Sequence, residues 1–229
     1  MVKVKWHGHS AFQIESGNYT VLVDPFFTGN TKAIAKADDI CADYILITHG
    51  HGDHLGDSFA IAKRYDATII APNELAVYAG QKGLKTHPMH IGGGYDFPFG
   101  RVKLTTAFHG SCIVEDDGTI VYTGMPCGFL IKTGGVTIYH AGDTALHAEM
   151  HILRDYESVD LALLPIGDNF TMGPRDAAIA VGLIEPKIVV PMHYGTWPLI
   201  DTSPEDFAKK VDTEGVEVRI MKPGEELVL

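Results

Sequence analysis

The sequence predicts an α/β (α+β) fold in which two mixed β-sheets are flanked by helices. Strand-like segments separated by tight turns stand at both ends of the chain, as in hairpins. Between them, short apolar strands alternate with helical segments, as in parallel sheets. The 229 residues contain no linker, repeat array or low-complexity segment, so we expect a single domain that spans residues 1–229.

The individual elements follow from periodicity and turn residues. Strands are expected at residues 2–6, 11–15, 20–24, 44–48, 68–71 and 102–106, with helices at 31–39, 57–64 and 73–81. Strands at 119–122, 128–133 and 136–140 are expected to form a meander, with a hairpin turn at Gly134 and Gly135. The rest of the chain predicts strands at 161–165, 187–191, 216–221 and 225–229, with helices at 175–184 and 204–211.

Charge and cysteine content narrow the class of partner. Acidic residues outnumber basic ones by 29 to 18, and this balance disfavours nucleic acid, whose binding depends on neutralised phosphates. Three widely spaced cysteines predict neither a disulfide framework nor a cysteine zinc motif, and they favour the reducing cytoplasm. No apolar run is long enough to predict a membrane span, and residues 1–6 predict an opening strand rather than a signal peptide. We therefore expect a small-molecule substrate, and a homo-oligomer stays open.

A cluster of metal-binding residue types follows the apolar strand at 44–48. His49, His51, Asp53 and His54 lie within six positions, and Gly50 and Gly52 allow the backbone to fold tightly between them. A catalytic divalent metal needs histidine nitrogens, carboxylate oxygens and one open position for water. The cluster supplies both kinds of protein ligand, so it predicts a metal site.

Three further candidate ligands each stand just past the end of an apolar strand. His109 follows residues 102–106, Asp143 follows 136–140, and His193 follows 187–191. Functional sites of layered α/β proteins gather at such strand ends. The repeated placement predicts that these residues join the cluster, which makes a two-metal centre.

Taken in order, these residues resemble the five motifs of the metallo-β-lactamase superfamily, and the resemblance covers nearly the whole chain. Residues 6–12, 22–26 and 167–173 further resemble the branch of metal-dependent hydrolases that includes the L-ascorbate-6-phosphate lactonases. The implied fold is a four-layer αβ/βα sandwich of two mixed sheets flanked by helices. Gly110 stands between His109 and Ser111, where a serine often follows the histidine directly, and this departure puts a role for the hydroxyl in doubt.

The resemblance implies a division of the ligands between two metals. It places His49, His51 and His109 on the first metal and Asp53, His54 and His193 on the second, with Asp143 bridging both. Zinc is the default metal, while manganese, nickel and iron also suit a site of histidines and carboxylates.

Several residues are expected to support the chemistry. Asp53 and His9 are the candidate catalytic residues: Asp53 to orient water and carry a proton, and His9 as an extra ligand, substrate contact or proton shuttle. Asp24 ends a buried strand, where a carboxylate needs a partner, and is expected to orient a ligand histidine. We also expect Asn169, Thr171 and Tyr194 to line the substrate pocket or contact the ligands, although a turn role would equally suit Asn169 and Thr171.

These inferences predict a metal-dependent hydrolase that uses a metal-activated hydroxide on a small ester, lactone or phosphoester. One alternative is a metal-dependent phosphodiesterase or nuclease that acts on nucleotides or RNA, but the acidic chain shows no basic surface for such a substrate. Another is an oxidoreductase; diiron relatives replace the second histidine of the loop with Glu, whereas His51 is present here. A third is a non-catalytic metal or ligand sensor, which predicts a missing ligand.

Overall fold

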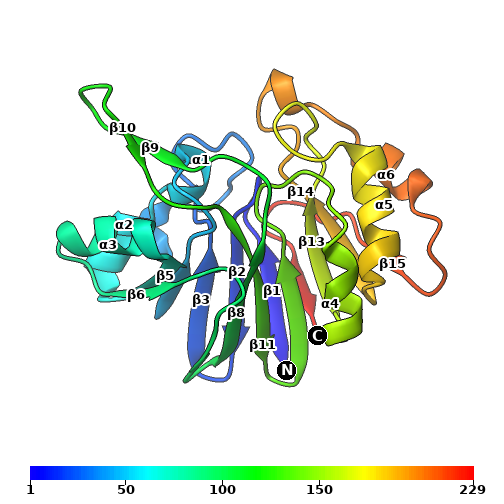
Figure 1. Cartoon of the computed structure of the whole chain (residues 1–229), viewed down its shortest axis with the longest axis horizontal. Helices are drawn as coiled ribbons and strands as arrows, with labels where there is room; N and C mark the ends of the chain where they lie inside the picture. The colour runs from blue at the N-terminus through cyan, green and yellow to red at the C-terminus, as the bar shows by residue number, and fades with distance from the viewer.

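The computed structural model describes residues 1–229 as two seven-stranded sheets with helices outside them (Figure 1). The first sheet has the order β16-β1-β2-β3-β4-β5-β6. Its strands are β1 (Val2–Trp6), β2 (Phe12–Ser16), β3 (Tyr19–Val23), β4 (Tyr44–Leu46), β5 (Thr68–Pro72), β6 (Thr86–Met89) and β16 (Glu226–Val228).

The second sheet has the order β15-β14-β13-β12-β11-β8-β7. Its strands are β7 (Gly94–Phe97), β8 (Gly100–Thr106), β11 (Cys127–Thr133), β12 (Val136–His140), β13 (Leu161–Pro165), β14 (Ile188–Met192) and β15 (Glu217–Val218). Gly134 and Gly135 make the turn from β11 to β12, both at positive φ, as a two-residue hairpin loop requires.

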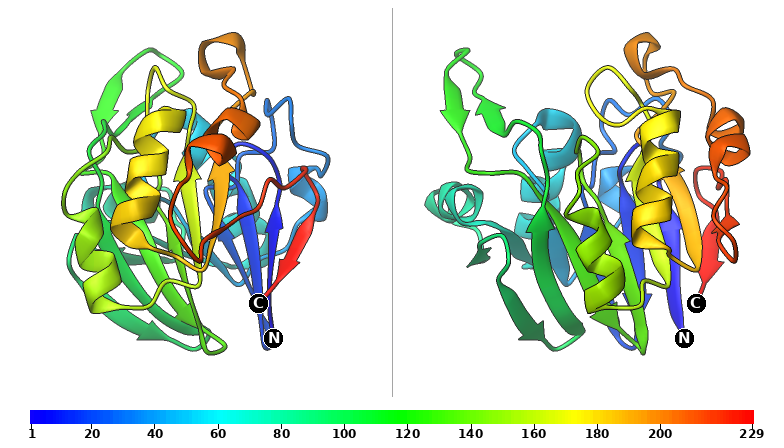
Figure 2. Two further views of the ribbon diagram at one scale, coloured as in Figure 1. Left: turned by 90° about the vertical axis from the view of Figure 1, so that its right-hand side faces the viewer. Right: turned by 45° about the vertical axis from the view of Figure 1, so that its right-hand side comes forward.

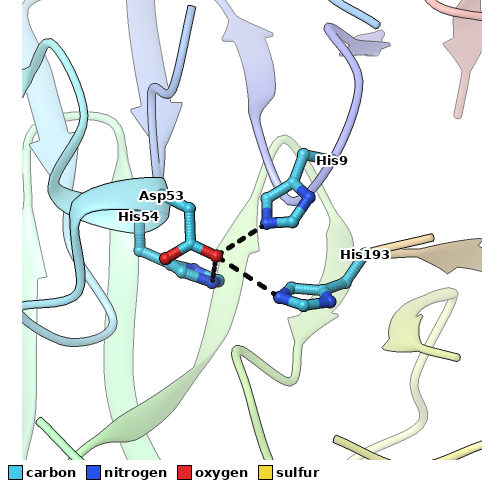
Figure 3. A group of neighbouring side chains, drawn as sticks. All are labelled: His9, Asp53, His54 and His193. Carbon is cyan, nitrogen blue, oxygen red and sulfur yellow. Dashed lines mark hydrogen bonds and ion pairs between the residues drawn. The ribbon is translucent and has the colours of Figure 1, made fainter. Parts of the chain in front are cut away.

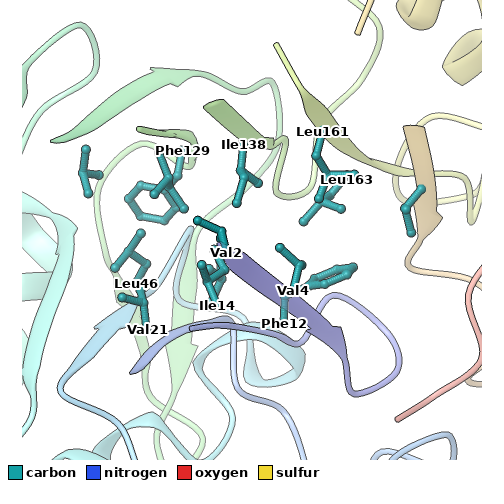
Figure 4. Packing of buried hydrophobic residues seen from close by; sticks show 14 of the residues in the cluster. Val2, Val4, Phe12, Ile14, Val21, Leu46, Phe129, Ile138, Leu161 and Leu163 are labelled. Atoms are coloured by element: carbon teal, nitrogen blue, oxygen red, sulfur yellow. The ribbon is translucent and has the colours of Figure 1, made fainter. Parts of the chain in front are cut away.

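Three layers of buried side chains hold the four layers of the backbone together. The first core lies between the sheets, where Val4 and Ile14 of the first sheet share a cluster with Phe129 and Leu161 of the second (Figure 4). The second core joins the outer face of the second sheet to α4 (Met150–Tyr156), α5 (Pro174–Ile184) and α6 (Pro204–Lys210). The third joins the first sheet to α2 (Ser58–Tyr65) and α3 (Asn73–Gln81). The predicted four-layer αβ/βα sandwich is confirmed, and Figure 2 shows the helices outside both sheets.

Strand direction brings the candidate ligands to one edge. The strands β1, β3, β4 and β5 all run the same way in the first sheet, as do β8, β12, β13 and β14 in the second. Their carboxyl ends lead into His9, Asp24 and His49 on one side, and His109, Asp143 and His193 on the other. The edge where the two sheets meet therefore collects every residue that the strand-end argument selected.

Several local predictions were wrong. The expected helix at 31–39 is mostly irregular and contains only the short 3-10 helix η1 (Ala37–Asp39), because none of its residues is buried and local turns take its hydrogen bonds. The expected strand at 119–122 is β10 (Ile120–Tyr122), but it pairs with β9 (Cys112–Val114) in a separate ribbon that projects from the body, not with β11 (Figure 1). Strands β6, β7 and β9 and helix α4 were not predicted from the sequence. Strand β6 contains a proline, a residue that argues against a strand although an edge strand tolerates it.

None of the helices has the length and apolar content that a membrane crossing demands.

Candidate metal centre

Close packing shapes the loop that carries the four clustered residues. After β4 the chain passes Gly50 and enters the one-turn helix α1 (Gly52–Leu55). A Cβ at Gly50 would lie 2.3 Å from the Thr123 hydroxyl, so the tight approach requires glycine there. The Gly50 backbone N–H also donates to Ser111 Oγ at 3.1 Å. Ser111 therefore holds the ligand loop in place, while Gly52 has open space around it.

Three histidine nitrogens converge on the side of the loop that faces β8. His51 Nδ1 lies 3.0 Å from His49 Nε2 and 3.3 Å from His109 Nε2. All three candidate donor atoms lie within 4.8 Å of one another. Such separations are those of ligands around one divalent ion, whose bonds to nitrogen are about 2.0–2.1 Å long.

A second group gathers around the Asp53 carboxylate (Figure 3). Asp53 Oδ2 lies 3.7 Å from His54 Nε2 and 3.6 Å from His193 Nε2. It also lies 3.0 Å from His9 Nε2. His9 lies in the loop after β1, Asp53 and His54 lie in α1, and His193 directly follows β14, so both halves of the fold contribute to the group.

Asp143 lies between the two groups. Its Oδ1 is 3.2 Å from His54 Nε2, and its Oδ2 is 3.1 Å from His193 Nε2 and 3.5 Å from His109 Nε2. The Asp143 carboxylate therefore reaches histidines of both groups. The seven predicted metal ligands and His9 thus lie together at one centre.

The residues present fit a metal-binding role. His54 Nε2, His193 Nε2 and Asp143 Oδ1 are buried and make no hydrogen bond. Buried polar atoms without partners are uncommon in folded proteins and call for a specific explanation. Here the orphaned atoms point at each other within a set of nitrogens and carboxylate oxygens, which is the donor set of zinc and related divalent metals.

The electrostatics of the group favour cations. Burial disfavours the His54 imidazolium, but the carboxylates of Asp143, Asp24 and Asp53 outweigh that and raise the pKa of His54 well above its usual value. Burial also opposes charge on His193, and the Asp143 carboxylate again outweighs it, so the pKa of His193 rises to about 9. These carboxylates thus favour protons on both histidines, and a metal ion would displace those protons.

The raised pKa of His193 predicts how the stability of chelator-treated protein depends on pH. Because the pKa is higher in the folded state, this stabilisation is complete below the unfolded value of 6.5 and is lost as pH rises through about 9. The free energy of unfolding should fall by up to about 3 kcal/mol between pH 6.5 and 9.5. Urea unfolding at several pH values across this range measures the free energy of unfolding, with metal-loaded protein as the control. A free energy that does not change with pH would contradict a charged His193.

Asp24, which the sequence predicts to orient a ligand histidine, contacts His54 directly and His49 through Thr48. Its Oδ2 accepts a hydrogen bond from His54 Nδ1 at 2.7 Å and one from the Thr48 hydroxyl at 2.7 Å. Its Oδ1 accepts from the Thr48 backbone N–H at 2.8 Å. The Thr48 oxygen in turn lies 2.9 Å from His49 Nδ1. Both histidines therefore present Nε2 to the centre, because the opposite nitrogen is occupied.

His9 is held from two sides. Its Nδ1 lies 2.9 Å from the hydroxyl of Thr196, while its Nε2 faces Asp53. Phe26 meets its ring edge-on at 5.7 Å and the Trp197 ring lies 5.0 Å away, both measured between ring centres. Burial lowers the pKa of His9 to about 4, so the ring is neutral and Nε2–H can donate to the Asp53 carboxylate.

The centre opens into a cavity of about 440 Å³. Its lining is His51, Gly52, Asp53, His109, Asp143, Phe170, His193 and Trp197. Asn169 and Thr171, expected to line the pocket, are not among its lining residues. The chain turns there with Asp168 and Asn169 at positive φ, and Phe170, which lies between Asn169 and Thr171, reaches the cavity. Tyr194 also does not line it, since its ring stacks on Trp6 with 5.7 Å between centres.

Sequence reasoning therefore missed Phe170 and Trp197 in the cavity and Thr48, Ser111 and Thr196 behind the ligands. Of these, only Thr48 could have been found from the sequence, because a hydroxyl directly before the histidine loop can hydrogen-bond to a neighbouring side chain. The others depend on loop conformation, which their residue types do not reveal.

The chain matches a known protein family over most of its length. Residues 3–193 match the family model described as a β-lactamase superfamily domain. The chain belongs to the β-lactamase superfamily. A "UPF0173 metal-dependent hydrolase" of Anoxybacillus flavithermus is 52% identical over 228 residues and covers 100% of both chains. One from Geobacillus sp. (strain WCH70) is 53% identical over 228 residues, again across 100% of both.

Solved structures share this fold. Igni18, described as a novel metallo hydrolase from the archaeon Ignicoccus hospitalis, superimposes with a TM-score of 0.89 at 37% identity, covering 99% of this chain and 97% of that one. The metallo-β-lactamase fold protein YhfI from Bacillus subtilis gives a TM-score of 0.73 at 17% identity, with 99% and 98% covered, and shows the fold alone. The predicted superfamily and enzyme class are confirmed, whereas the narrower resemblance to the lactonase branch stays a prediction.

Proposed function

We propose that this metal-dependent hydrolase holds two divalent ions and cleaves a small ester, lactone or phosphoester. The observation that supports this most strongly is the pair of donor groups with Asp143 between them. His49, His51 and His109 would hold one ion, and Asp53, His54 and His193 the other. When bound, the ions would lower the pKa of a water molecule towards neutrality and polarise the bond to be cleaved.

The protein's own residues have separate roles in this proposal. Asp143 and the six other ligands fix where the reacting groups sit. Asp53 is more exposed than Asp143, with 24% of its side chain accessible against 3%, and it lines the cavity. Its carboxylate is therefore placed to accept a proton from the attacking water and return it to the leaving oxygen. Hydrolysis then needs no covalent intermediate with the protein.

His9 is proposed to position Asp53. Its Nε2–H donates to Asp53 Oδ2, so the carboxylate keeps one orientation throughout the reaction. The Thr196 hydroxyl, by donating to His9 Nδ1, keeps the proton on Nε2.

Removing the Thr196 hydroxyl tests that arrangement. Thr196→Val keeps the shape but frees His9 Nδ1, and we expect the affinity for the ion held by Asp53 to fall roughly tenfold. Competition with a chelator measures the affinity, and ¹⁵N shifts of His9 report its tautomer. Thr196→Ser should retain both properties. An unchanged tautomer in Thr196→Val would show that the hydroxyl has no positioning role.

Hydrolysis itself is tested with a panel of esters, lactones, thioesters, phosphomonoesters and phosphodiesters on metal-reconstituted protein. The proposal predicts turnover of at least one class, with ¹⁸O from solvent water appearing in the product and no labelled protein intermediate. Tight metal binding without turnover of any class would instead support a metal or ligand sensor.

Zinc is the metal that we propose, since five histidines and two carboxylates surround the centre. The three unpaired cysteines support a reducing, cytoplasmic setting. We also propose that the chain is one domain, because both sheets supply ligands to the same centre.

A further inference from the structure

The cavity offers little besides the metal ligands for a substrate to contact. Five of the residues that line it, two carboxylates and three histidines, are proposed ligands. Because those side chains would coordinate the ions, they cannot also bind the part of a substrate that lies away from the bond to be cleaved. Only Gly52, Phe170 and Trp197 are left, and no lysine or arginine lies over either aromatic ring.

The two aromatic side chains come from separate loops of the second sheet. Phe170 lies between β13 and α5 and is 47% exposed, and Trp197 follows His193 and is half-buried. The Trp197 ring lies 6.4 Å from the His193 ring, measured between centres, which places it beside the proposed reacting centre. Aromatic side chains gain most from flat apolar partners that bury their faces.

A second anionic group, away from the ions, would be poorly bound. No lysine or arginine lines the cavity, and Lys32, which lies beside Gly195, is not among the lining residues. Such an anion would face aromatic rings, whose faces carry partial negative charge, in a protein of net charge −11. For sugar hydroxyls, the lining offers only one side-chain hydrogen-bond donor beyond the proposed ligands, the indole N–H of Trp197.

From these contacts we propose that the substrate is a neutral ester or lactone with a flat apolar group, which Phe170 and Trp197 select. This narrows the proposed function and rests on it. For a lactone, the oxygen of water bonds to the carbonyl carbon, the ring C–O bond breaks, and the proton passes through Asp53 to the leaving oxygen. The product is the hydroxy acid, and no co-reactant is needed.

Three δ-lactones that share the reacting ring test the selection on zinc-loaded protein. Dihydrocoumarin carries a fused aromatic ring, δ-valerolactone carries nothing, and 6-phosphoglucono-δ-lactone carries a distal phosphate. With each kcat/KM divided by the rate of the same lactone with hydroxide in solution, we expect dihydrocoumarin to exceed δ-valerolactone roughly tenfold or more, and the phosphorylated lactone to come last. Preference for the phosphorylated lactone would overturn the proposal.

Variants connect that preference to the two rings. Phe170→Ala should lower the ratio of the corrected kcat/KM values for dihydrocoumarin and δ-valerolactone roughly tenfold. Trp197→Phe keeps an aromatic face and should retain most of this ratio. Leu199→Ala is the matched control, since Leu199 is apolar, 64% exposed and near Trp197 in sequence, yet outside the lining. A ratio unchanged in Phe170→Ala would overturn the assignment.

A binding measurement separates this proposal from the proposed function. Trp6 and Trp197 are the two tryptophans, and Trp6 is buried, so a ligand in the cavity should alter fluorescence from Trp197. We expect 2-phenylethanol to quench it, with Kd raised roughly tenfold in Phe170→Ala. If this holds while no substrate is hydrolysed, the hydrolase proposal fails and the aromatic site stands. If esters are hydrolysed but 2-phenylethanol neither quenches nor inhibits, the aromatic site fails alone.

Discussion

Replacing Asp143 by Asn is expected to leave at most one tightly bound metal ion per chain and to lower kcat on the order of 10³-fold. The carboxylate reaches histidines of both donor groups, and a neutral amide offers one weak oxygen donor in its place. Elemental analysis after gel filtration gives the metal content, and steady-state kinetics give kcat.

Asp168→Asn is the matched control, because Asp168 lies in a loop near the cavity but is exposed and is not a proposed metal ligand. Asparagine also tolerates its positive φ. Two ions per chain and nearly full activity in Asp143→Asn would show that the carboxylate does not bridge.

Replacing Asp24 by Ala should affect both stability and metal affinity, although Asp24 is not a proposed ligand. The side chain is fully buried and accepts three hydrogen bonds, two from Thr48 and one from His54. Its loss leaves these donors unpaired, so we expect a destabilisation of about 3–5 kcal/mol and metal affinity that is 10–100-fold weaker. Chemical unfolding and chelator competition measure the two effects.

Asp57 provides a control with the same local chemistry. It also accepts three hydrogen bonds, from the backbone N–H groups of Phe27 and Thr28 and from the Thr28 hydroxyl, but it contacts no ligand histidine. Asp57→Ala should therefore lower stability while leaving metal affinity unchanged. Equal losses of affinity in the two variants would mean that Asp24 acts through general stability and not through His54.

The sequence was sufficient for the candidate ligands because their placement follows from strand ends. His109, Asp143 and His193 each stand beyond a strand whose apolar pattern is visible, and parallel strand direction then brings them to one edge. The same reasoning located Asp24, since a carboxylate at the end of a buried strand needs a partner. The layered fold was predictable for a similar reason, as buried parallel strands require helices on their outer faces.

Loop side chains were not predictable in this way. Tyr194 follows a ligand directly, but His193 has a φ of 55°, which breaks the strand alternation and sends the Tyr194 ring onto Trp6. Positive φ at Asp168 and Asn169 similarly brings Phe170, not its polar neighbours, to the cavity. Non-glycine residues adopt this region only where surrounding contacts impose it, so local sequence does not reveal it.

The most direct test is a titration of metal-free protein with Zn²⁺, in which bound metal and hydrolysis are measured on the same samples. We predict no hydrolysis before metal is added, activity that rises with occupancy to a plateau at two ions per chain, and complete loss when a chelator removes them. Full hydrolytic activity in protein that contains no measurable metal would contradict a metal-dependent mechanism at this centre.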